Sequence, residues 1–259
     1  MSQALRKTAD GAAPAGATDE RAAAEQVRQM FTDIAPRYDL LNHLLSCNVD
    51  RLWWRRTART FAHILRRPQA RVLDLCCGTG DMAQAMLRVR EHAGAAGGGP
   101  GVNPITGVDF SAAMLERARA KSTGKPLRWV EADALHMPFA DGSFDLVVSS
   151  FGFRNLANYQ AGLDEILRVL APGGEVGILD FGEPGGVFGR LYGFYFRRVL
   201  PKIGTLISGV RGPYSYLPES VERFPAPGEM RERMERAGFR EVNWTPYTFG
   251  IAGLHRGTK

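Results

Sequence analysis

The chain has 259 residues, of which 44% are hydrophobic, 33 are Lys or Arg and 27 are Asp or Glu. These values fit a globular protein of one large or two small domains, and they exclude a collagen-like, disulfide-stapled or wholly disordered chain. The formal net charge of +6 is localised, because the stretch from Arg51 to Arg71 holds seven Arg and no acidic residue. The remainder of the chain therefore has a net charge of −1.

The three cysteines predict neither a disulfide framework nor a metal site. Cys76 and Cys77 are neighbours in apolar surroundings and Cys47 has no CxxC partner, a pattern typical of a reducing compartment. No apolar run reaches the roughly 18 residues that a membrane span needs. Residues 1–18 carry no apolar leader, so we expect a disordered tail and not a secretory signal.

Two helices are predicted before residue 68. The first covers residues 19–34 and ends at Ala35-Pro36, since the residue before a proline is disfavoured in a helix. The second covers residues 50–65 and is amphipathic and basic. Its expected apolar side consists of Trp54, Ala58, Phe61, Ile64 and Leu65, and its basic side of Arg51, Arg55, Arg56 and Arg59.

From residue 68 onward short apolar strands alternate with helices. The predicted strands are 71–75, 105–109, 127–130, 144–149 and 176–179, with helices around 82–89, 114–118 and 163–170. Such alternation favours a parallel sheet covered on both faces, in which ligands bind outside the carboxyl ends of the strands. The residues to inspect are therefore Gly78 to Gly80, Asp109, Asp133 and Ser150 to Asn155.

The alternation stops between residues 181 and 227, which are aromatic, glycine-rich and basic. It resumes with a helix at 229–237 and two strands at 242–248 and 251–255. We interpret residues 181–227 as an insert that covers the sheet. Five glycines between Gly94 and Gly101 predict a flexible loop without chemistry.

A glycine-rich turn follows the first predicted strand, at Gly78-Thr79-Gly80, and opens a helix. Its backbone N–H groups could hold a ligand, but the spacing also fits a loose dinucleotide fingerprint. Later strand ends decide between these interpretations. Asp109 could accept hydrogen bonds from both ribose hydroxyls, and Asp133 is placed to meet an adenine amino group.

With these positions the chain resembles class I S-adenosylmethionine-dependent methyltransferases, and more narrowly the ubiquinone/menaquinone biosynthesis C-methyltransferase family. The resemblance covers roughly residues 27–259. The matching segments are Arg37 to Asn42, Arg51-Leu52-Trp53, Leu73 to Asp81, Asp109-Phe110-Ser111 with Met114-Leu115, Pro138-Phe139, Ser150 to Asn155, Tyr214 to Ser220 and Phe224-Pro225. The Phe-Gly-Phe-Arg-Asn motif at 151–155 and the Tyr-x-Tyr-Leu-x-Glu-Ser motif at 214–220 are the specific part, whereas the glycine-rich turn is generic to the superfamily. Cys76-Cys77 and the 94–101 insert depart from the family pattern, and we expect neither to touch the ligand.

The resemblance implies an α/β, Rossmann-like fold with a mostly parallel seven-stranded sheet between helices. It divides the chain into a tail (1–18), an N-terminal helical lid (19–67) and a methyltransferase domain (68–259) with the cover insert 181–227. It also implies that the cofactor is S-adenosylmethionine. By matching position, its contacts fall on Asp74, Gly78, Thr79, Gly80, Asp109, Asp133, Ala134 and Ser150.

The family transfers the methyl group to a ring carbon of a reduced, prenylated quinone. That carbon becomes nucleophilic when a ring oxygen loses its proton, so the site needs a base or a charge-stabilising donor. We predict that Arg154 stabilises the developing phenolate and that Asn155 holds the ring oxygen. Arg is a poor base, so the base is a water or another residue. Asp39 could be that base, a positioning residue or a helix cap, and His43 and His136 are candidates by residue type alone.

The acceptor implied for this chain is demethylmenaquinol, with a polyprenyl methoxy-benzoquinol of ubiquinone biosynthesis as the alternative. An NAD-dependent oxidoreductase and a nucleic-acid-binding module or RNA methyltransferase are the alternatives from other classes. We expect neither nucleic acid nor metal as a partner, and a homodimer stays open. The expected location is cytoplasmic, at the inner face of the membrane, with residues 51–59 and 188–202 touching anionic lipid.

Overall fold

The computed structural model describes residues 10–38, 48–92, 102–182 and 213–259, together with residues 184, 185, 189 and 193. Asp39 and His43, most of the expected cover and the 94–101 loop lie outside these ranges. The predicted α/β fold is confirmed: seven strands form one sheet in the order β3-β2-β1-β4-β5-β7-β6. β7 runs antiparallel to β5 and β6, and the other neighbours are parallel.

The strands lie close to the positions that the apolar runs predict. They are β1 (Val72–Leu75), β2 (Ile105–Asp109), β3 (Leu127–Glu131), β4 (Phe144–Ser150), β5 (Leu170–Phe181), β6 (Arg240–Tyr247) and β7 (Ala252–Thr258). β1, β2 and β4 are buried almost throughout, as expected for parallel strands that are covered on both faces.

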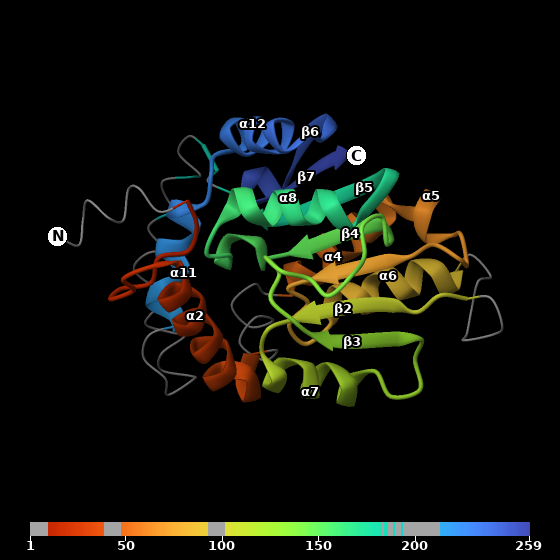
Figure 1. Cartoon of the computed structure of the whole chain (residues 1–259), viewed down its shortest axis with the longest axis horizontal. Coiled ribbons are helices and arrows are strands. Elements are labelled where there is room, and N and C mark those ends of the chain that lie inside the picture. Colours follow the sequence, from red (N-terminus) through yellow and green to blue (C-terminus); the bar gives the residue numbers. More distant parts are fainter. Residues whose placement is uncertain are drawn as a thin grey trace.

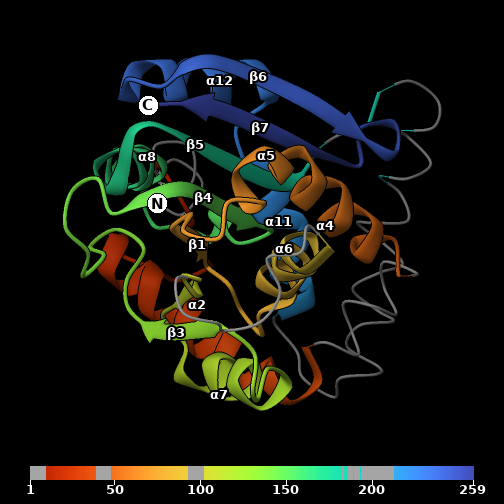
Figure 2. The same ribbon diagram turned by 90° about the vertical axis from the view of Figure 1, so that its right-hand side faces the viewer.

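One face of the sheet is covered by α8 (Tyr159–Val169) and α12 (Pro227–Ala237). The other is covered by α4 (Val49–Thr60), α5 (Ala62–Leu65) and α6 (Asp81–His92), which stand together on one side in Figure 2. Successive residues of a strand serve opposite faces: Leu73 and Val147 pack under α8, whereas Val72 and Leu146 pack under α6.

The predicted helix 50–65 is two helices, because Phe61 leaves helical geometry with φ −98° and ψ 19°. Its two faces are as predicted. Ala58, Phe61, Ile64 and Leu65 are buried, Trp54 is half-buried, and all four Arg of the basic side are exposed. Phe61 reaches the sheet at Gly177 of β5, where a Cβ would lie 2.6 Å from its ring. α4 and α5 thus belong to the layer that covers the sheet.

α2 (Glu20–Ile34) and α11 (Pro213–Arg223) lie instead at the carboxyl ends of the strands, near the arrowheads in Figure 1. Asp19 caps α2 by accepting a hydrogen bond from the Ala22 N–H at 2.8 Å, and the helix stops before Pro36, as predicted. The last turn of α2 and η1 (Ala35–Arg37) pack on α7 (Ala112–Lys121).

The chain just before α2 is held on the same edge. The Ala12 N–H donates to the Leu156 carbonyl at 2.7 Å, and the Tyr159 N–H donates to the Asp10 carbonyl at 2.7 Å. Asp10 also pairs with Arg233 of α12. Ordered contacts therefore begin before residue 18, where the sequence predicts the end of the tail.

Candidate functional site

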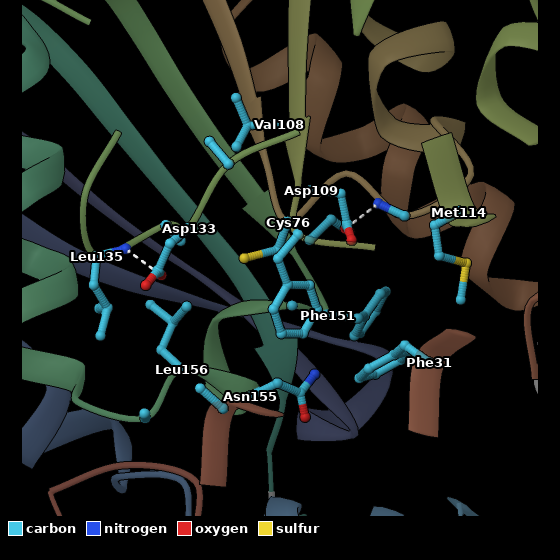
Figure 3. Close-up of a pocket in the computed structure, with 18 of the residues that line it drawn as sticks. Phe31, Cys76, Val108, Asp109, Met114, Asp133, Leu135, Phe151, Asn155 and Leu156 are labelled. Carbon is cyan, nitrogen blue, oxygen red and sulfur yellow. Dashed lines mark hydrogen bonds between the residues drawn. The ribbon is translucent and has the colours of Figure 1, made fainter. Parts of the chain in front are cut away.

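A pocket opens at the carboxyl ends of β1, β2 and β4, and its wall also includes residues of α2. The lining residues are Ala24, Phe31, Tyr38, Cys76, Gly78, Val108, Asp109, Phe110, Met114, Ala132, Asp133, Ala134, Leu135, Ser150, Phe151, Gly152, Asn155, Leu156 and Ala157. Figure 3 shows the side chains of Asp109, Asp133 and Asn155 around its central space. An apolar pocket with a few polar groups is typical of a small-molecule site.

Asp109 ties the glycine-rich turn to the end of β2. Its carboxylate accepts the Gly78 N–H at 2.8 Å and the Ser111 N–H at 3.0 Å. These hydrogen bonds favour the charged form, but burial outweighs them and raises the pKa of Asp109 to about 6. The carboxylate still has free lone pairs on the pocket side, because each oxygen can accept more than one hydrogen bond.

The two predicted glycines serve different purposes. Gly78 lines the pocket at φ +53°, and a Cβ there would meet only Tyr38 at 3.8 Å, so the turn presents its backbone to open space. Gly80 does not line the pocket. A Cβ on Gly80 would lie 2.3 Å from the Trp129 ring of β3. The missing side chain of Gly80 therefore makes room for Trp129, and a role of Gly80 in the approach of the ligand stays a prediction.

Asp74 and Thr79 are also away from the lining. Asp74 is fully buried below the turn. One of its carboxylate oxygens accepts the Ala83 N–H of α6 at 2.8 Å, and the other has no hydrogen-bond partner in the described ranges. Burial raises the pKa of Asp74 well above its usual range. The Thr79 hydroxyl accepts a hydrogen bond from Lys121 at 2.9 Å. In this structure both residues stabilise the turn and the start of α6.

Asp133, Ala134 and Ser150 line the pocket. Asp133 accepts the Leu135 N–H at 2.9 Å, which fixes the loop after β3. The Ser150 hydroxyl accepts a hydrogen bond from the Trp54 indole N–H at 2.9 Å. This bond joins residues 96 positions apart and attaches α4 to the pocket wall.

Arg154 and Asn155 lie in η2 (Phe153–Asn155), directly after β4. Asn155 lines the pocket, and its buried side-chain oxygen has no hydrogen-bond partner among the described residues. Arg154 is buried beside it and pairs with Asp180 at the end of β5. The Arg154 side chain donates to Asp180 at 2.7 Å and its backbone N–H at 3.2 Å. The Arg154 Nε has no hydrogen-bond partner within the described part of the chain, so part of the guanidinium can still donate.

Sequence reasoning missed two residues of this site. Asp180 follows the same strand-end rule that singled out Asp109 and Asp133, and applying the rule to the fifth strand would have found it. Cys76 was expected to stay away from the ligand, but it stands in the pocket wall at φ +54°. Burial raises the pKa of its thiol well above the usual range.

Cys76 also explains the glycine in the Phe-Gly-Phe-Arg-Asn motif. A Cβ on Gly152 would lie 2.3 Å from the Cys76 Cβ.

Of the two histidines named by type, His136 is exposed and lies 3.6 Å from Asp133, and His43 falls outside the described residues together with Asp39. Within the described ranges, no three His, Cys, Asp or Glu side chains gather in a way that could hold a metal ion.

A family model described as the ubiE/COQ5 methyltransferase family matches residues 18–259. A demethylmenaquinone methyltransferase of Thermus thermophilus is 50% identical over 89% of this chain and all of its own length. A ubiquinone/menaquinone biosynthesis C-methyltransferase of Geobacter sulfurreducens is 43% identical over 91% of this chain and 89% of its own. Among solved structures, an S-adenosylmethionine-dependent methyltransferase of Thermotoga maritima aligns with a TM-score of 0.62 at 18% identity, covering 90% of this chain and 99% of its own, which supports the fold alone.

We expect that removing one partner of the buried Arg154–Asp180 pair destabilises this edge of the sheet. Replacing Asp180 with Ala leaves a buried guanidinium without its carboxylate, so unfolding free energy should fall by about 3–5 kcal/mol. Urea denaturation measures the change. The matched control is Glu235→Ala, which removes an exposed i,i+4 partner of Arg231 and should cost about 0.3–0.5 kcal/mol. Equal losses in both variants would contradict the expectation.

Proposed function

Because the chain belongs to the ubiE/COQ5 methyltransferase family, we propose that it transfers a methyl group from S-adenosylmethionine to a ring carbon of demethylmenaquinol, which gives menaquinol. The observation that carries this proposal is the 50% identity to the Thermus thermophilus demethylmenaquinone methyltransferase over that protein's full length. The family assignment leaves the oxidoreductase and the nucleic-acid alternatives without support. Methylation of a polyprenyl methoxy-benzoquinol is the second candidate acceptor reaction, favoured by the Geobacter relative.

The residues of the pocket fit the cofactor. Asp109 offers carboxylate lone pairs to the ribose hydroxyls, the backbone at Gly78 is open for close approach, and Asp133 with Ala134 would border the adenine. Ser150 would bound the methionyl part. S-Adenosylmethionine supplies an electrophilic methyl group when bound; the protein has to orient it and exclude water.

The acceptor ring would lie at η2. Asn155 would hold a ring oxygen through its side chain, and Arg154 would stabilise the negative charge that develops on the ring oxygen as the ring hydroxyl gives its proton to the base. Asp180 holds Arg154 in place for this role. Asp39 is our candidate for the base, since it directly follows the pocket-lining Tyr38 in the chain. α2 would act as the lid, because Ala24 and Phe31 form part of the pocket wall.

The proposed acceptor carries a prenyl chain and resides in a bilayer, so we propose that the chain works at the inner face of the membrane. None of the helices in the described ranges is long and apolar enough to cross one. The expected contact through residues 188–202 lies almost wholly outside the described residues. The homodimer stays a prediction that analytical ultracentrifugation would test.

The function is tested by incubating the full chain with S-adenosylmethionine and a short-prenyl demethylmenaquinol, followed by mass analysis of the quinone fraction. We expect the product to gain one methyl group on the ring. The parallel reaction with a prenyl methoxy-benzoquinol separates the two acceptor classes, and a mixture with NAD in place of S-adenosylmethionine is the blank. If neither acceptor is methylated although calorimetry shows that S-adenosylmethionine binds, the proposal is refuted.

We expect cofactor affinity to rise with pH through about 6. The ribose hydroxyls need the ionised Asp109, whose pKa is raised to about 6. Below that pH affinity should therefore fall by up to about tenfold per unit, and above it affinity should level off. Isothermal titration calorimetry with S-adenosylhomocysteine measures this affinity at several pH values between about 5 and 8, a range that brackets the pKa of Asp109. Asp109→Asn should bind more weakly and lose this dependence, and an unchanged profile in that variant would contradict the assignment.

Arg154→Lys tests the role of the guanidinium. Lysine keeps a positive charge beside Asp180 but loses the Nε donor and the planar fork. We expect kcat to fall about 100-fold, as for the loss of one oxyanion donor, with little change in cofactor affinity. Steady-state kinetics with titration of S-adenosylhomocysteine separates the two effects. Normal turnover in a correctly folded variant would show that Arg154 has no part in the reaction.

A further inference from the structure

A groove on the outer surface between α4, α5 and α6 is strongly basic. It lies on the side of the sheet away from α8 and α12. Its lining residues are Arg51, Leu52, Arg55, Arg59, Ala62, Arg66, Ala85, Arg88, Val89 and His92. The lining thus contains five guanidinium groups and no carboxylate, and the pocket described above shares none of these residues.

The five arginines of this groove have no carboxylate partner in the described part of the chain, unlike several arginines elsewhere. Arg71, Arg168 and Arg233 each pair with a carboxylate. In contrast, no ion pair to any described residue is made by Arg51, Arg55, Arg59, Arg66 or Arg88. The first three repeat at i, i+4 along α4, a spacing at which like charges repel. A bound anion would remove this repulsion.

One exposed apolar side chain lines the same groove, and a second lies on a loop that is fastened to the start of α4. Leu52 is 58% exposed and lines it, and Phe249 is 83% exposed. These are the two large hydrophobic residues that stand out as exposed in the described part of the chain. Phe249 follows Thr248, whose hydroxyl accepts a hydrogen bond from the Trp53 indole at 2.8 Å, so its loop is fastened to the start of α4. Cations beside exposed apolar side chains are the composition of a surface that lies on anionic lipid.

The opposite side of α4 reaches the pocket. Trp54, which directly precedes the exposed Arg55 and lies three residues after the exposed Arg51, donates a hydrogen bond to Ser150 in the pocket wall. A lipid surface that engages the groove would therefore lie close to the edge of the sheet where the pocket opens. That geometry suits an acceptor whose prenyl chain stays in the bilayer.

We propose that the groove between α4, α5 and α6 binds the phosphate of anionic phospholipid headgroups, while Leu52 and Phe249 enter the interfacial layer. This inference rests on the proposed function, which requires access to a prenylated acceptor. Nucleic acid also carries phosphate, but the exposed Leu52 and Phe249 have no use in an electrostatic contact with it. An anionic lipid surface is therefore the partner that accounts both for the positive charge of the groove and for the exposed apolar side chains of Leu52 and Phe249.

Flotation of the full chain with phosphatidylglycerol-containing vesicles tests the proposal, with pure phosphatidylcholine vesicles as the reference. We expect binding only to the anionic vesicles at low salt. The double variant Arg55→Gln/Arg88→Gln changes both walls of the groove. Each basic residue near such a surface contributes about fivefold to partitioning, so the variant should lose roughly 30-fold. The matched control is Arg236→Gln/Arg240→Gln, two exposed arginines on α12 and β6 that leave the same net charge.

Three results would overturn the proposal. The first is an equal loss of vesicle binding in the two double variants, which would indicate a diffuse charge effect. The second is that the wild-type chain does not bind anionic vesicles. The third is that single-stranded RNA binds at the groove while vesicles do not. Leu52→Gln should weaken vesicle binding at unchanged charge. Methylation of a short-prenyl acceptor in detergent-free solution should be normal in the groove variants, so failure of docking and failure of the methyl transfer are read separately.

Discussion

The site depends on one buried carboxylate. Asp109 binds the Gly78 N–H from the turn after β1 and the Ser111 N–H at the start of α7, so it joins two neighbouring strand ends and the helix after the second. Burial raises the pKa of Asp109 to about 6, above its unfolded value near 4. Ionisation of this group therefore costs folding stability as pH rises from about 4 through 6. A ligand that donates hydroxyl hydrogens to the carboxylate would stabilise its charged form, and the proposed contact of Asp109 with the cofactor ribose would act in this way.

Two layers of residues can be distinguished around that carboxylate. Gly80, Asp74 and Thr79 hold the turn from below through Trp129, the first turn of α6 and Lys121. Gly78, Asp109 and Asp133 face the open space. A motif such as Gly-x-Gly is thus shared between packing and binding. Arg154 and Asn155 divide in the same way, because Asp180 fixes the first while the second meets the pocket.

The sequence predicts the elements and the strand-end residues because both follow from local rules: apolar periods set the strands, and parallel strands end at one edge. Asp109, Asp133, Ser150 and Asn155 were found this way. The partners of these residues were not found, since no local signal links Trp54 to Ser150 or Trp129 to Gly80, and these contacts arise only when distant segments pack. The break at Phe61 and the ordered contacts of residues 10–12 have the same origin.

α4 contributes to the core, to the pocket wall and to the basic surface of the protein. Ala58 on its apolar side is buried in the core, and Phe61 at its end packs against β5. Trp54 reaches the pocket wall. The arginines of α4 face outward and have no carboxylate partner in the described chain. A surface helix ordinarily mixes both signs of charge, which relieves repulsion at i, i+4. This helix instead concentrates one sign on one side, and the resulting cost in stability is offset by burial on the other. The packing of the apolar side of α4 against the sheet holds the helix in place despite the repulsion between its arginines. The charged surface of α4 can therefore stay exposed without distorting the pocket wall that the same helix supports.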